Sequence, residues 1–110
     1  MRDASIRHIG LTWRIREGRI DDYDVRHARM WPKLEARLRE LGLVDCTVFR
    51  RGRDCFGHFQ ILGDWATYVE LSEREPLSRQ WEQEFADVIE PQDGADGNPE
   101  PLHHVWSLGD

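Results

Sequence analysis

One segment constrains the fold of this chain more than any other, because it joins a helical repeat to side chains that are suited to chemistry. It runs from Ile20 to Gly42 and reads IDDYDVRHARMWPKLEARLRELG. Apolar and aromatic residues recur in it every three or four positions, as on the buried side of an amphipathic helix. These residues are Tyr23, His27, Met30, Trp31, Leu34, Leu38 and Leu41. The segment predicts a helix whose buried stripe begins with a phenol, an imidazole and an indole.

The two ends and the middle of this helix carry local signals. Asp21 is placed to cap the first turn, because its carboxylate can accept hydrogen bonds from free backbone N–H groups. Gly42 supplies a residue that adopts the left-handed conformation with which helices commonly end. Pro32 removes a backbone donor and restricts the residue before it, so we expect a kink or a short break near Trp31.

Length and charge limit the classes of protein to which the chain can belong. A chain of 110 residues is expected to form one domain over residues 1–110, with one core. A net charge of −6 argues against nucleic acid or an anionic membrane as the main partner, since both reward clustered basic residues.

Apolar runs and cysteines narrow the environment of the protein. The chain contains no run of secretory length or membrane-spanning length, so we expect a cytoplasmic protein. Cys46 and Cys55 lie outside any CxxC pattern and predict neither a zinc site nor a disulfide framework. His103 and His104 are neighbours on an expected strand and would point to opposite faces, so we expect no metal site there.

The remaining elements follow from alternation, turns and helical spacing. Strands are expected over Ser5 to Ile15, Leu43 to Phe49 and Cys55 to Leu62, the last two as an antiparallel pair. Asp64 is placed to cap a second helical region, and a third helix is expected from Leu77 to Ile89. A last strand is expected over Leu102 to Leu108.

This order of elements is the βαββαβ plan of ferredoxin-like α+β proteins, in which helices cover one face of a four-stranded antiparallel sheet. The other face would stay open and would hold His8, Thr12, His58 and Gln60. An open face of this kind favours a ligand or a second copy of the chain, and we expect a homodimer.

The spacing Tyr23-x3-His27-x3-Trp31-Pro32, placed after the first strand, resembles the signature of the L-rhamnose mutarotase family. The likeness extends over nearly the whole chain, through the hairpin and the tryptophan of QWEQEFADVI to the short aromatic C-terminal segment.

The resemblance implies a dimeric α/β-barrel protein that interconverts the α and β anomers of a sugar without a metal or an organic cofactor. It implies that His27 is catalytic and that Tyr23 and Trp81 contact the sugar. Glu82 stands where the family has a second tryptophan, and Cys46 where it has a tyrosine. These two departures leave open which aldose is the substrate, with L-rhamnose and L-fucose the first to consider.

The proton chemistry of a mutarotase fits these residue types. Opening a sugar ring needs one group that takes a proton from the anomeric hydroxyl and one that gives a proton to the ring oxygen. Histidine can serve as either, because both of its forms are populated near neutral pH. Two other classes share the expected architecture or its features: cofactor-free monooxygenases and polyketide cyclases, and non-catalytic binding proteins. Carboxylate or amide groups around His27 would favour a sugar, and a wholly apolar lining a polyketide.

Overall fold

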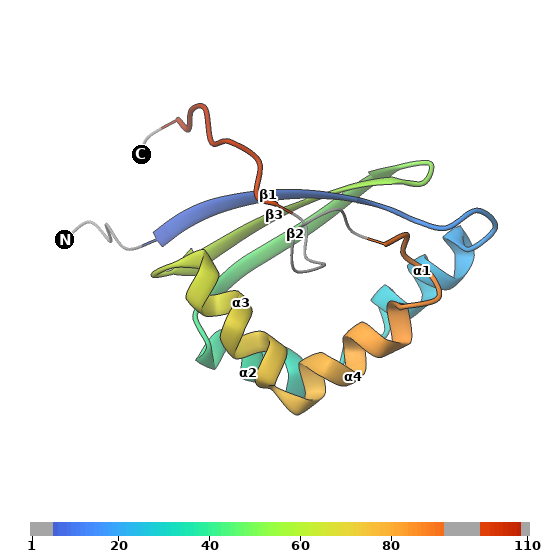
Figure 1. The fold of residues 1–110 in the computed structure, drawn as a ribbon, viewed down its shortest axis with the longest axis horizontal. Helices are drawn as coiled ribbons and strands as arrows, with labels where there is room; N and C mark the ends of the chain where they lie inside the picture. The colour runs from blue at the N-terminus through green and yellow to red at the C-terminus, as the bar shows by residue number, and fades with distance from the viewer. Residues whose placement is uncertain (1–5, 92–99, 109–110) are drawn as a thin grey trace.

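The computed structural model describes residues 6–91 and 100–108 and places them in an α+β arrangement. The described elements are β1 (Ile6–Arg14), α1 (Ile20–Ala28), α2 (Pro32–Glu40), β2 (Leu43–Arg51), β3 (Asp54–Leu62), α3 (Trp65–Arg74) and α4 (Pro76–Phe85). The strands form one antiparallel sheet in the order β1-β3-β2. All of these helices lie on the same side of the sheet (Figure 1).

The segment from Ile20 to Gly42 forms two helices, as its proline predicts. Helix α1 ends at Ala28 and α2 begins at Pro32, with Trp31 in an extended conformation (φ −76°, ψ 122°). This is the conformation that proline favours in the residue before it, and Pro32 itself occupies a first-turn position that needs no N–H donor. Gly42 follows α2 with φ +117°. The break near Trp31 and the stop at Gly42 are therefore confirmed.

The two predicted helix caps have different outcomes. Asp64 caps α3, because its carboxylate accepts a hydrogen bond from the Thr67 backbone N–H at 3.1 Å. The prediction for Asp21 is wrong, because α1 begins at Ile20 and Arg19, two residues before Asp21, occupies the cap position without a side-chain cap. The Arg19 guanidinium is held there by the Asp22 carboxylate at 2.6 Å. Asp21 lies instead in the first turn of the helix.

The inner face of the sheet, which meets the helices, carries the core. Directly paired residues of antiparallel strands lie on the same face, so Leu11 and Trp13 share this face with their partners Gly57 and Cys55. One cluster of buried residues joins the sheet to α1 and to the end of α4: Ile15, Tyr23, Cys55, Phe85 and Val88.

The outer face carries the polar and aromatic residues that its alternation predicts. His8 pairs with Gln60, Gly10 with His58, and Thr12 with Phe56. The Nδ1 atom of His8 lies 3.0 Å from the Nε2 atom of His58. None of the described helices covers this face (Figure 1).

The predicted fourth strand, Leu102 to Leu108, is wrong for the described chain, which has a three-stranded sheet. One backbone hydrogen bond, from the Leu102 N–H to the Gly10 carbonyl at 2.8 Å, joins this segment to the edge of β1. The chain then leaves that edge (Figure 1), and Val105 and Trp106 are 86% and 73% exposed. The alternation that suggested a strand has no sheet face to pack against within the described part of one chain.

The helix predicted from Leu77 to Ile89 corresponds to α4, which is shorter and ends at Phe85. The next residues pair with the end of β1, since the Arg16 N–H donates to the Val88 carbonyl at 2.7 Å and the Glu90 N–H to the Arg14 carbonyl at 2.8 Å. Tertiary pairing thus replaces the helical pattern that continues in the sequence.

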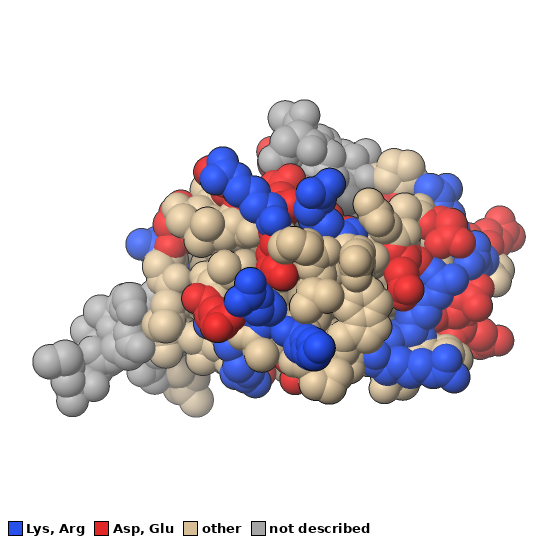
Figure 2. All heavy atoms as spheres, turned by 90° about the horizontal axis from the view of Figure 1, so that it is seen from below, with Lys and Arg blue, Asp and Glu red and all other residues tan. Residues whose placement is uncertain are grey.

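The helix side of the surface intersperses acidic and basic side chains (Figure 2). None of the described helices is both long and apolar enough to cross a lipid bilayer.

Candidate active site

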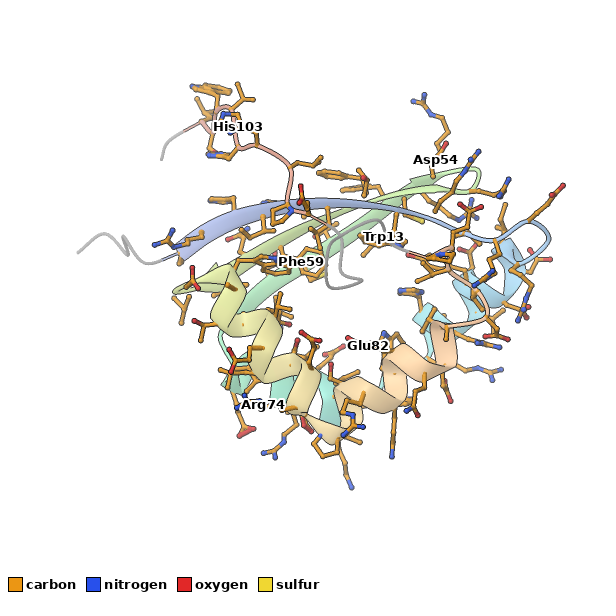
Figure 3. All side chains as sticks on the ribbon, in the orientation of Figure 1. Trp13, Asp54, Phe59, Arg74, Glu82 and His103 are labelled. Atoms are coloured by element: carbon orange, nitrogen blue, oxygen red, sulfur yellow. The ribbon has the colours of Figure 1, made fainter. Side chains whose placement is uncertain are left out.

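A cavity of about 860 Å³ lies between the sheet and the helices, within the size range of small-molecule sites. Trp13 and Phe59 point into it from the inner face of the sheet, and Glu82 faces them from α4 (Figure 3). The cavity is lined by the three site residues that the family resemblance implies and by the two positions that depart from the family pattern: Tyr23, His27 and Trp81, and Cys46 and Glu82. Side chains far apart in the sequence are thus brought to one space.

His27 is held in a defined tautomer by its own helix. Its Nδ1 atom lies 3.0 Å from the backbone carbonyl oxygen of Tyr23, one turn earlier on α1. Because a carbonyl oxygen can only accept, Nδ1 carries the hydrogen and donates it. In the neutral ring Nε2 then keeps its lone pair. The arrangement gives a histidine that can accept a proton at Nε2.

Burial favours the neutral form of this ring. Loss of hydration lowers the pKa of His27, and the hydrogen bond to the Tyr23 carbonyl and the charge of Asp24 oppose this shift only in part. The Asp24 carboxylate is itself paired with the guanidinium of Arg50, whose Nε lies 2.9 Å from Oδ1. His27 is therefore poised as a base near neutral pH.

Three aromatic rings fix the orientation of the His27 ring. The Tyr23 ring lies 4.2 Å from it between centroids, and Phe85 and Trp81 meet it edge to face at 4.7 and 5.7 Å. Trp81 is supported in turn by Trp31, at 5.3 Å in a T-shaped contact. Trp31, which is extended at the break between α1 and α2, thus packs against Trp81, the tryptophan beside His27.

Tyr23 is more deeply buried than we expect of a residue whose only role is to contact a sugar, since its exposed fraction is 3%. Its hydroxyl oxygen accepts a hydrogen bond from the Trp13 Nε1 atom at 3.0 Å. Burial and a hydrogen bond to the Cys55 sulfur raise the pKa of Tyr23, so the phenol stays protonated. The hydroxyl is engaged within the protein, and the ring supports His27 from below.

Cys46 lies on β2, where it pairs with Phe59, and its side chain borders the cavity. Cys46 is exposed to solvent and forms no disulfide. The surrounding protein nevertheless raises the pKa of its thiol to about 11, chiefly by burial and also through Asp45. The thiol therefore stays protonated near neutral pH and lacks the thiolate character of a nucleophile.

Several residues of the cavity wall were not predicted from the sequence, among them three aromatic ones. Trp13, Phe59 and Tyr68 all line it, although only their packing could be anticipated from the pattern. The signal that could have found Trp13 and Phe59 is the strand register, which places both on the inner face beside Gly57. A Cβ atom on Gly57 would lie 2.6 Å from Trp13 and 2.8 Å from Phe59. Glycine is required there so that both rings can lie across β3.

Metal-ligating side chains do not converge in this region. Within residues 6–91 and 100–108, no three side chains of His, Cys, Asp or Glu are grouped so that they could hold a metal ion. His103 is exposed on the C-terminal segment, as is His104, whose Nε2 atom lies 2.7 Å from the Ser107 hydroxyl.

Comparison with known proteins decides the family. A family model described as L-rhamnose mutarotase matches residues 8–108. The chain belongs to the L-rhamnose mutarotase family. The L-rhamnose mutarotase of Burkholderia orbicola is 31% identical over 104 residues, which span 88% of this chain and 96% of that protein. The L-rhamnose mutarotase of Flavobacterium johnsoniae is 29% identical over 100 residues, or 89% of this chain and 92% of that one.

Two solved structures share the fold of this family member. A crystal structure of L-rhamnose mutarotase from Formosa agariphila aligns with a TM-score of 0.73 at 20% identity, over 93% of this chain and 98% of that one. Tetracenomycin F2 cyclase from Streptomyces glaucescens, a type-II polyketide cyclase, aligns over the same shares with a TM-score of 0.60 at 13% identity. At these identities the likeness concerns the fold alone, so it does not by itself distinguish a mutarotase from a cyclase.

Proposed function

We propose that this protein interconverts the α and β anomers of a free aldose, with L-rhamnose and then L-fucose as the first candidates. The observation that carries the proposal is His27, a half-buried histidine whose neutral form is favoured and whose Nε2 is the acceptor atom, on the wall of a cavity in a chain of the L-rhamnose mutarotase family. Such a group can take the proton of an anomeric hydroxyl.

The reaction begins with this proton transfer. His27 Nε2 accepts the hydroxyl proton as the bond between the anomeric carbon and the ring oxygen breaks, and the ring oxygen receives a proton from an acid. The open-chain aldehyde turns about its C1–C2 bond and closes on its other face, which returns both protons. His27 starts as the base because its Nδ1 hydrogen is held by the Tyr23 carbonyl.

Trp81 and Tyr23 complete the proposed sugar site. The Trp81 ring borders the cavity beside His27 and offers an aromatic surface for the C–H face of a sugar. Tyr23 takes part chiefly through its ring and its backbone carbonyl, since its hydroxyl is bonded to Trp13 and Cys55.

The cavity wall favours a sugar over an aromatic polyketide. Aromatic rings form much of it, but four carboxylate residues also line it: Glu35, Asp45, Glu82 and Glu90. Acceptors of this kind suit the many hydroxyl donors of a sugar.

The test is saturation-transfer or exchange NMR across a panel of free sugars. We expect faster anomer exchange for at least one deoxyhexose or related aldose in the presence of the protein. A flat response across a broad panel would refute the activity.

We further propose that the protein is a cytoplasmic homodimer. The uncovered outer face of the sheet, with exposed Phe49 and Phe56, supports the dimer. Two free cysteines in the described chain suit a reducing compartment.

A further inference from the structure

Helix α4 places a carboxylate on the side that faces the cavity. The residues of this helix that line the cavity are spaced i, i+3, i+4 and i+7, as on one face of a helix; they are Ser78, Trp81, Glu82 and Phe85. Phe85 and Trp81 pack around His27. Glu82 is the exposed residue of this set, and it reaches toward the space below the sheet (Figure 3).

No contact with another side chain accounts for this carboxylate. In the part of the chain that the structure describes, Glu82 forms neither an ion pair nor a hydrogen bond to a side chain, whereas Glu90 of the same cavity is paired with Arg53 at 2.7 Å. Glu82 is a solvent-exposed residue of the cavity wall. Its carboxylate is therefore available to a ligand that enters the cavity.

Resting on the mutarotase activity proposed above, we propose that Glu82 is the second proton-transfer group of the site, which protonates the ring oxygen of the sugar while His27 deprotonates the anomeric hydroxyl. Trp81 links the two groups. Its ring meets the His27 ring with centroids 5.7 Å apart, and His27, Trp81 and Glu82 all line the same cavity. A sugar lying on Trp81 would thus have both groups at its border.

The proton balance closes over one cycle. His27 Nε2 takes the proton from O1 as the C1–O5 bond breaks, its electron pair goes to O5, and O5 takes the proton of the Glu82 carboxyl group. After rotation about C1–C2, the Glu82 carboxylate takes this proton back as O5 attacks C1, and the His27 imidazolium returns its proton to O1. Both groups end in their starting forms, and no further reactant is needed.

The environments of the two residues suit these opposite roles. Burial lowers the pKa of His27, whereas burial and the negative charge of Glu73 raise the pKa of Glu82. A base that stays neutral and a carboxyl group that keeps its proton longer are the forms that the first step requires. The other titratable or charged residues that line the same cavity or the adjoining dent between α3 and α4 are Arg16, Tyr23, Glu35, Arg39, Asp45, Cys46, Tyr68, Glu73, Arg79 and Glu90.

The test compares Glu82→Gln with Glu84→Gln. Glutamine keeps the shape and hydrogen-bonding ability of Glu82 but cannot give up a proton, and Glu84 is an exposed carboxylate of the same helix outside the cavity wall. With the sugar that the wild-type protein exchanges, E82Q should lower kcat by about two to four orders of magnitude with little change in KM. E84Q should match the wild type, and both variants should keep its melting temperature or exceed it.

The pH profile separates acid catalysis from simple binding. The wild-type rate should fall on the alkaline side as Glu82 loses its proton, and E82Q should lack this limb. A variant that keeps kcat and only raises KM would overturn the proposal, because it would make Glu82 a hydroxyl-binding residue.

A titration checks the carboxyl group without reference to activity. In carbon-13 NMR of the labelled carboxyl groups, the resonance missing from E82Q should titrate above the ordinary glutamate pKa of about 4.3. A midpoint at or below that value would overturn the acid role. If the wild-type protein accelerates the anomer exchange of no sugar, both the mutarotase activity and this role are refuted. If the wild-type protein is active and E82Q is equally active, only the role of Glu82 is refuted.

Discussion

His27 combines a fixed tautomer with partial burial, so substitution should separate its chemical role from its packing role. His27→Ala removes the Nε2 acceptor and should lower sugar exchange by about two to four orders of magnitude. It should also destabilise the fold by about 1 to 3 kcal/mol through lost packing and its hydrogen bond. Exchange NMR and thermal melting measure the two effects. His103→Ala is the matched control, because His103 lies outside the cavity (Figure 3); near-normal exchange in His27→Ala would contradict its assignment.

The burial of His27 also makes stability depend on pH. Its folded pKa lies below the unfolded value of about 6.5, so between these two values the unfolded chain binds more protons. The free energy of unfolding should therefore fall as the pH drops through this window and level off below the folded pKa. Urea unfolding from about pH 7 to pH 5 should show a smaller slope for His27→Gln than for the wild type. Identical slopes would indicate that the ring titrates normally.

Gly57 is the residue on which the roof of the cavity depends. Alanine there would place a Cβ atom 2.6 Å from the Trp13 indole and 2.8 Å from the Phe59 ring. The indole would have to move away from the Tyr23 hydroxyl, so we expect a loss of about 1 to 3 kcal/mol and slower sugar exchange. Gly10→Ala, on the outer face of the same sheet with its nearest contacts at 3.3 Å, should cost less. Equal melting temperatures for the two variants would show that the cavity roof adapts.

At the scale of elements, the sequence predicted correctly those features that depend on neighbouring residues alone. Pro32 gave the helix break, Gly42 the helix end, and alternation gave the strand faces on which His8 and His58 meet. A wrong prediction arose where the backbone forms hydrogen bonds with a segment that is distant in the sequence. The helical pattern continues to Ile89, but residues 88–90 pair with the end of β1. The motif was enough to predict Tyr23 and His27 as site residues. Predicting Trp13 and Phe59 in the cavity wall would have required the pairing register of β1 and β3.

The contrast between Asp64 and Asp21 gives a test of helix capping. Asp64→Ala removes the acceptor for the Thr67 N–H and should cost about 1 kcal/mol. Asp21→Ala removes only a first-turn charge and should cost less, about 0.3 to 1 kcal/mol. Chemical denaturation of both variants measures the difference. A larger loss for Asp21 would mean that the helix begins where the sequence alone suggested.

At the scale of the whole molecule, the missing fourth strand and the uncovered sheet face belong to the same problem. Leu102 begins to pair with β1, beside Gly10, and His104 stacks near His8 with centroids 6.1 Å apart. The apolar residues that follow have no partner surface in the described chain. The apolar character of these residues indicates that they become buried. It does not indicate whether a second copy of the chain buries them.

The outer face therefore provides the last prediction. Phe49 and Phe56 are 60% and 39% exposed on it, and burying such a face against a copy would release water from both. Light scattering at micromolar concentration should give about twice the chain mass of 13.0 kDa. Phe49→Glu should shift the protein toward monomer, because it would place a charge in the interface. Val25→Glu is the matched control, since Val25 is 48% exposed on α1 and should leave the dimer intact. A monomeric wild type, or equal dissociation of the two variants, would rule out this face as the dimer interface.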